Sequence, residues 1–120
     1  MTETVQFMEE TRQGVTIVHI VNQRLIEPHL SDDLTRRLCG LIEGGALAML
    51  IDMGAVARIS SVFFRSFIMA GKKANEKKAR IAFCNLTPVI KEGFVITGLD
   101  KLFKIYENEG KALAELAVKQ

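Results

Sequence analysis

Residues 50–61 read LIDMGAVARISS and join a run of apolar residues to an amphipathic helical pattern. The apolar run covers residues 46–53 and predicts a buried strand that ends at Asp52. Ser60 belongs to the residue types that commonly begin a helix, and the pattern after it predicts a helix to about Glu76. A strand, a short loop and a helix in this order are typical of an α/β domain.

Two strands and one helix are predicted before this unit. Residues 15–21 (VTIVHIV) are rich in β-branched residues and predict a central strand that is covered on both faces. A weaker strand is predicted over residues 5–8, joined to the central one by a turn at Gln13 and Gly14. Ser31 is predicted to cap a helix that Gly44 ends.

A strand, a helix, an edge strand and a last helix are predicted after it. Residues 79–84 predict a buried strand, and the Thr-Pro pair at residues 87–88 predicts a helix that ends in a left-handed residue at Gly98. Residues 102–106 predict a short edge strand, and Asn108 is predicted to cap the last helix. We therefore predict a single domain over residues 1–120, with an α/β fold. Its centre is a mostly parallel mixed sheet of about five strands packed with about four helices.

The composition favours a small intracellular protein. The chain has 120 residues, 48% hydrophobic and 25% charged, which excludes a disordered tail and a fibrous protein. Two cysteines are too few for a disulfide-rich secreted domain, and the N-terminus lacks a signal-peptide pattern, so we expect a cytoplasmic protein. The net charge of +2 includes a basic run at residues 72–80, which we interpret as a solvated helix end because no nucleic-acid-binding motif accompanies it.

No arrangement of residues in the sequence predicts catalysis. His19 and His29 have no Cys, Asp or Glu at the spacing of a metal site, so no metal and no cofactor are expected. Cys39 and Cys84 fall in apolar patterns and are interpreted as small core residues. Asp52 is a lone carboxylate at a strand end, where bracing of the loop is the ordinary role. We therefore predict that the protein is not an enzyme and has no catalytic residue.

The predicted helix after Ser60 has one core side and one polar side. Arg65 and Ser66 lie on the polar side, and the apolar Val62 and Met69 lie there with them. These two side chains are either chance exposures or a docking patch beside the helix start, and both interpretations stay open. The core side contains these residues: Phe63, Phe64, Phe67, Ile68, Ala70, Gly71 and Ala74.

Three segments carry a resemblance to a known family. Residues 51–63 read IDMGAVARISSVF, residues 97–105 read TGLDKLFKI, and residues 109–113 read EGKAL. They resemble the STAS domain (sulfate transporter and anti-sigma factor antagonist). Its signature is L-D-L-S-x-V-x-x-I-D-S-S-G, followed by T-G-L-x-x-x-F-x-I and by a last helix that starts near an Ala-Leu pair. The order is the same, and the resemblance covers nearly the whole chain. In the first segment the agreement lies in the strand and at Asp52, Val56, Ile59 and Ser61.

The resemblance implies a non-catalytic binding protein of a partner-switching pathway that regulates transcription. In the family, the unphosphorylated antagonist binds an anti-sigma factor, often a serine kinase, and thereby frees the sigma factor. Phosphorylation of a serine at a helix start breaks this complex. The counterpart of that serine is Ser61, with Ser60 as the alternative. The partner-binding surface is expected around Ser60, Ser61, Val62, Arg65 and Met69.

Two positions depart from the family pattern and keep other functions open. Ser60 stands where the family has Asp, and Phe63 stands where it has Gly. The alternative is a degenerate STAS domain that serves as a constitutive scaffold or assembly subunit of a signalling or transport complex. A third hypothesis is a small-ligand or nucleotide carrier with a pocket at the strand ends. We expect a protein partner, no nucleic acid and no direct membrane insertion. The partner's identity and the oligomeric state stay open, with a weak homo-oligomer among the alternatives.

Overall fold

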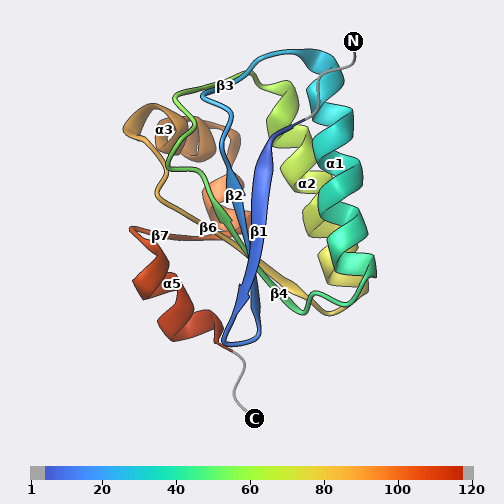
Figure 1. Ribbon diagram of the computed structural model, residues 1–120. Helices are drawn as coiled ribbons and strands as arrows, with labels where there is room; N and C mark the ends of the chain where they lie inside the picture. Colours follow the sequence, from blue (N-terminus) through green and yellow to red (C-terminus); the bar gives the residue numbers. More distant parts are fainter. Residues whose placement is uncertain (1–4, 118–120) are drawn as a thin grey trace.

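A five-stranded sheet forms the centre of the computed structural model, which describes residues 5–117 (Figure 1). Residues 1–4 and 118–120 lie outside this range, and with them the N-terminal segment considered above for a signal peptide. No helix within the described range is both long enough and apolar enough to cross a membrane. The elements are β1 (Phe7–Arg12), β2 (Val15–Ile20), β3 (Arg24–Leu25), α1 (Pro28–Glu43), β4 (Ala48–Asp52), β5 (Arg58–Ile59), α2 (Val62–Glu76), β6 (Arg80–Cys84), α3 (Pro88–Thr97), α4 (Leu99–Leu102), β7 (Lys104–Tyr106) and α5 (Glu109–Leu116).

The sheet is mixed and mostly parallel, as predicted. Its strand order is β1-β2-β4-β6-β7; β1 pairs antiparallel with β2, and the other neighbours are parallel. Gln13 and Gly14 link β1 to β2 with φ angles of 54° and 79°. Two consecutive positive φ angles are typical of the type I′ turn, whose twist suits a hairpin. The predicted turn is therefore confirmed, and the hairpin fixes the register of the edge strand.

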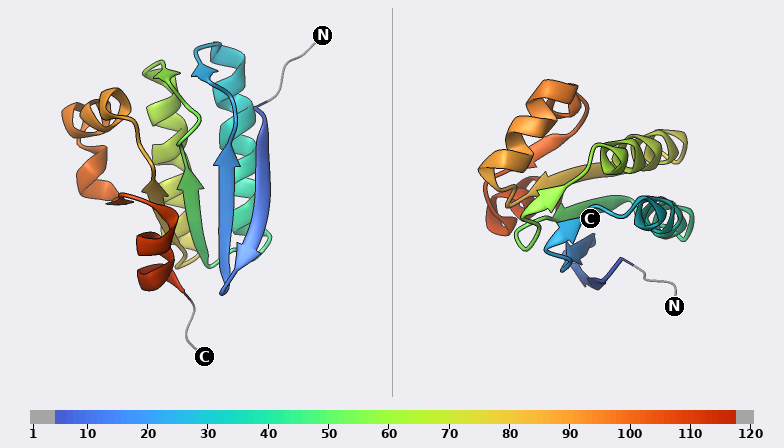
Figure 2. Two further views of the ribbon diagram at one scale, coloured as in Figure 1. Left: turned by 60° about the vertical axis from the view of Figure 1, so that its left-hand side comes forward. Right: turned by 90° about the horizontal axis from the view of Figure 1, so that it is seen from above.

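Helices cover the two faces of the sheet unequally (Figure 2). The helices α1 to α4 share one apolar core with alternate residues of the strands, such as Val18, Ile51 and Phe83. The short helix α5 covers the other face, where Ile17 and Leu50 are among the buried strand residues. A central strand buried on both faces explains why residues 15–21 are almost uniformly apolar.

Several element boundaries differ from the predicted ones. Helix α1 begins at Pro28 rather than after Ser31, because proline suits the first turn of a helix; the Ser31 hydroxyl donates to the Pro28 carbonyl oxygen at 2.7 Å. Strand β1 lies later than predicted because its hairpin partner, not its own apolar content, sets its extent. Leu102 belongs to the short helix α4, so β7 begins only at Lys104. The two-stranded sheet of β3 and β5 was not predicted.

The caps predicted at the C-terminal end are confirmed in position. Gly98 ends α3 in the left-handed conformation, with φ of 79°. The Asn108 side chain accepts a hydrogen bond from the Lys111 backbone N–H at 2.9 Å, as an N-cap residue does.

Cys84 is buried, Cys39 is half-buried, and both are free thiols. Burial, with the nearby charges of Asp52 and Glu109, raises the pKa of the Cys84 thiol to about 12.

Candidate functional site

The loop between β4 and α2 ends in two serines with different environments. The Ser60 backbone N–H donates to the Leu25 carbonyl oxygen at 2.8 Å, which ties this loop to β3. The Ser60 Oγ atom is buried and has no hydrogen-bond partner within residues 5–117. Ser61 is exposed, occupies the N-cap position of α2, and makes no capping hydrogen bond with its side chain. The predicted cap at Ser60 is therefore wrong by one residue, and Ser61 is the accessible serine of the pair.

A groove of about 360 Å³ lies between the N-terminal halves of α1 and α2. Val62 and Met69 are 41% and 43% exposed, so their predicted place on the polar side of α2 is confirmed. Ser61 directly precedes Val62 in the chain and therefore lies next to one end of the groove. The groove is lined by Ser31, Asp32 and Thr35 of α1 and by Val62, Arg65, Ser66 and Met69 of α2.

Two residues in the first half of α2 have buried side chains. Ser66 is only 2% exposed, and its hydroxyl donates to the Ser31 carbonyl oxygen at 2.9 Å. The prediction of a solvated Ser66 is wrong because α1 packs alongside α2 and covers this position. Phe63 is fully buried, which confirms its predicted inward direction. The aromatic ring that replaces the family's glycine therefore does not obstruct the surface.

Most of the chain matches the model of one protein family. The family model of the STAS domain matches residues 6–112. The chain belongs to the STAS domain family. The match spans every strand of the central sheet and both helices of the groove, which confirms that the resemblance covers nearly the whole chain.

Three proteins that resemble this STAS protein match it over most of their own length. BtrV of Bordetella bronchiseptica, assigned provisionally as an anti-sigma factor antagonist, is 23% identical over 92 residues, which cover 77% of this chain and 79% of BtrV. An anti-sigma-factor antagonist (STAS) domain protein from Planctomyces limnophilus has the same fold, with a TM-score of 0.81, 22% identity, and coverage of 97% and 100% of the two chains. The phosphorylated form of the Bacillus cell fate determinant SpoIIAA aligns with a TM-score of 0.69 and 14% identity, covering 91% of this chain and 97% of SpoIIAA.

Apart from the groove, this STAS domain has a cluster of charged side chains on the α5 face of the sheet. His19 Nε2 lies 3.0 Å from Glu10 Oε1, and His19 Nδ1 lies 3.1 Å from Asp52 Oδ2 and 3.8 Å from Glu109 Oε2. Arg12 pairs with Glu10 and Glu109 at 2.7 and 2.9 Å. Ligand atoms of Glu10, His19 and Glu109 lie within 4.8 Å of one another, a spacing that suits a metal ion, but the Arg12 guanidinium already supplies a cation to both glutamates.

The cluster favours a charged His19. Burial lowers the pKa of His19, but the hydrogen bond to Glu10 and the charges of Glu109 and Asp52 outweigh it, so the pKa lies above its ordinary value. Burial raises the pKa of Asp52, but hydrogen bonds from the Gly54 N–H at 2.9 Å and the Asn85 amide at 3.2 Å help to make the net shift downward. These two bonds also confirm that Asp52 braces the loop after β4.

Stability should therefore fall in the pH range where His19 loses its proton. A group whose pKa is raised in the folded state contributes stability below its unfolded value of about 6.5 and loses it as the pH rises through the folded value. The urea midpoint of the wild type should drop between pH 6 and pH 9 by more than that of His19→Gln. The matched control is His29→Gln, at an exposed position of α1, and its urea midpoint should drop as much as that of the wild type. An equal drop in the wild type and His19→Gln would contradict this assignment.

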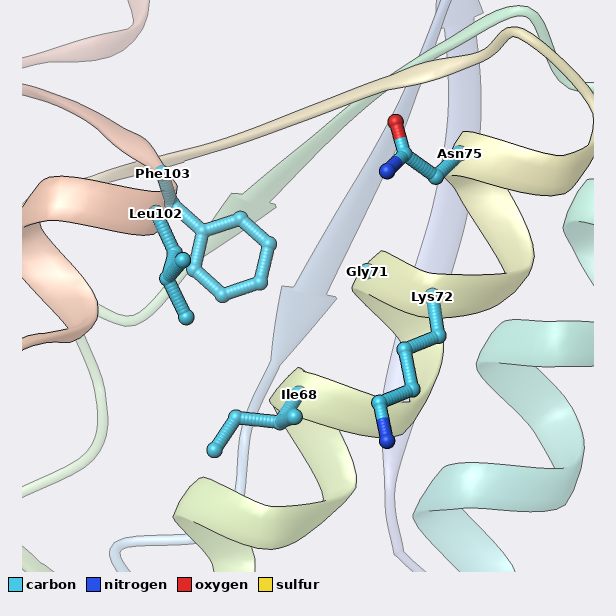
Figure 3. A pocket seen from close by; sticks show the side chains of 6 residues that line it. All are labelled: Ile68, Gly71, Lys72, Asn75, Leu102 and Phe103. Carbon is cyan, nitrogen blue, oxygen red and sulfur yellow. The ribbon is translucent and has the colours of Figure 1, made fainter.

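Two further hollows bear on a small-ligand function. One, of about 310 Å³, lies at the strand ends, where the third hypothesis places a pocket. Its charged lining is the Asp52 carboxylate and the neighbouring His19, with no lysine or arginine, which disfavours nucleotide phosphates. The other, of about 260 Å³, is open to solvent on the side of α2 away from α1 (Figure 3). There the Phe103 ring lies against Gly71, and a Cβ atom at position 71 would approach Phe103 Cζ to 2.8 Å.

Proposed function

We propose that this STAS protein is a non-catalytic antagonist that binds an anti-sigma factor or serine kinase and is released by phosphorylation of Ser61. The observation that carries the proposal is the position of an exposed Ser61 beside a groove containing exposed Val62 and Met69. The relatives named as anti-sigma factor antagonists, and the phosphorylated SpoIIAA with the same fold, support the class of function. The compartment that goes with this role is the cytoplasm.

The groove has the chemistry of a docking site for a protein. Val62 and Met69 offer apolar contact, Arg65 and Asp32 offer both signs of charge, and Ser31 and Thr35 offer hydroxyl groups. An apolar centre with a polar rim is the ordinary composition of a specific protein interface. Methionine adapts its shape to different partner side chains, which suits a surface that binds and releases.

Phosphorylation of Ser61 would block the groove without unfolding the protein. A phosphoserine carries about −1.5 to −2 charges at neutral pH. At the N-terminus of α2 the helix dipole favours negative charge, so the fold tolerates the modification. A partner seated over Val62 and Arg65 would instead have to desolvate that charge, and its affinity would fall. Ser60 is a poorer phosphorylation site because its Oγ atom is buried.

The test is to map the phosphate and measure its effect on binding. The partner is recovered from the native cell with the unphosphorylated protein as bait, and the purified kinase is then supplied with ATP. Mass spectrometry should place the phosphate on Ser61 in the wild type and in Ser60→Ala, and find none in Ser61→Ala. The phosphorylated protein should bind the partner about 100-fold more weakly or worse.

The same experiment separates the proposed switch from a constitutive scaffold. The scaffold is favoured by Ser60, which lacks the negative charge of the family's aspartate. It requires binding that does not respond to a phosphate at position 61. Absence of phosphate on both serines, or unchanged affinity after phosphorylation, would exclude the switch and leave the scaffold.

A further inference from the structure

The two-residue strands β3 and β5 place two arginines side by side. The strands pair in parallel, with Arg24 opposite Arg58 and Leu25 opposite Ile59. Leu25 is fully buried and Ile59 packs against the same core, so strand alternation puts both arginines on the outer side, where both are exposed. Like charges directly opposite each other on neighbouring strands are unfavourable. An anion bound between the two guanidinium groups would offset this repulsion.

No carboxylate of the described chain supplies this anion. Within residues 5–117, salt bridges involve Arg12, Arg36 and Arg37, but neither Arg24 nor Arg58. Guanidinium groups bind phosphate oxygens through two parallel N–H donors, with stronger hydrogen bonds than neutral groups form. Two exposed guanidiniums on adjacent strands thus suit a phosphate dianion.

Ser61 lies within reach of this arginine pair. It is three residues after Arg58, so the two Cα atoms are at most about 10 Å apart, a distance that an extended arginine side chain and a phosphoserine side chain together can span. The hydrogen bond from the Ser60 N–H to the Leu25 carbonyl oxygen keeps β3 beside the same loop. Figure 2 shows β3 and β5 next to each other at the end of the molecule where α1 and α2 begin.

We infer that the phosphate of phosphorylated Ser61 is held by the guanidinium groups of Arg24 and Arg58. This rests on the proposed function, in which Ser61 is the phosphorylated residue. The modification then supplies the missing anion of the arginine pair and fixes the phosphate at the end of the groove. Phosphorylation accordingly stabilises the fold while it prevents docking.

The test compares the effect of phosphorylation in matched variants. Phosphoserine is introduced at position 61 during translation, so no kinase is needed, and the melting temperature is measured with and without it. The change in Tm on phosphorylation should be about 4 °C lower in Arg24→Gln/Arg58→Gln than in the wild type. The control is Lys101→Gln/Lys104→Gln, which removes the same charge from two exposed positions and should leave the wild-type change intact.

Equal Tm changes in the wild type and the arginine variant, of either sign, would overturn the inference. If the double variant does not fold, the single variants Arg58→Lys and Arg24→Lys serve in its place, because lysine keeps the charge but lacks the paired donors. A wild-type change in Tm in both single variants would also overturn the inference. A kinase that leaves Ser61 unmodified would refute the proposed function, whereas the result with installed phosphoserine would still decide whether the arginines bind it.

Discussion

Phe83→Ala is expected to lower the free energy of unfolding by about 3–5 kcal/mol. Phe83 of β6 is fully buried, and its ring makes edge-on contacts with Phe67, Phe94 and Phe103 at centroid distances of 4.9, 5.0 and 5.3 Å. These rings come from α2, from α3 and from the residue that follows α4. Removal of one ring leaves a cavity and breaks three aromatic contacts at once, which places the loss at the upper end for core substitutions.

Urea unfolding followed by circular dichroism measures this effect. The matched control is Ile96→Ala in α3, where the side chain is 77% exposed and the change should stay within about 0.5 kcal/mol. A loss below about 1 kcal/mol for Phe83→Ala would mean that the aromatic cluster does not hold the helices to the sheet.

Ser66→Asp should destabilise the fold by about 3 kcal/mol or more at neutral pH. The Ser66 hydroxyl donates to the Ser31 carbonyl oxygen in the contact between α1 and α2. A carboxylate there would bring a buried, unpaired negative charge against an acceptor. The loss should shrink in acid, because a buried carboxyl group has a raised pKa and is neutral below it.

Ser61→Asp is the matched control for this substitution, because it adds the same charge five residues earlier at an exposed N-cap position. Aspartate is favourable there, so the free energy of unfolding should change by less than about 1 kcal/mol. Equal unfolding midpoints of the two variants would contradict the burial of Ser66. The expected contrast would show that position 61, but not position 66, accepts a negative charge without loss of the fold.

The sequence predicted the elements with strong local patterns. The β-branched residues 15–21, the Gln13-Gly14 turn and the Asn108 cap each act over a few residues, and the structure contains all three. β3 and β5 escaped prediction because two residues show no periodicity. Ser66 was misplaced because a helical wheel separates polar from apolar residues but does not show where a neighbouring helix packs.

The sequence predicted those parts of the candidate groove that lie on one helix, but not the parts that depend on how helices pack together. The exposure of Val62 and Met69 follows from their place on one helix, and the structure brings both to the groove with Arg65. The groove's other wall comes from α1, which no local pattern connects to α2. For the His19 cluster, the hairpin register puts Glu10 on the same face as His19, so the two-residue turn at Gln13 and Gly14 is the sequence signal for this contact. Glu109 lies far away in the sequence, and only the packing of α5 brings it there.

The two walls of the groove come from different parts of the chain, so the residues that select a partner and the residue that controls binding can change independently. On the proposed function, the signal is received at Ser61, directly before α2, while Asp32 and Thr35 of α1 face the partner from a different stretch of the chain. Substitutions in α1 can therefore redirect a duplicated copy to a new partner without altering the residue that is modified. On the proposed function, copies of this domain diverge in partner through the α1 wall of the groove and keep the same control residue.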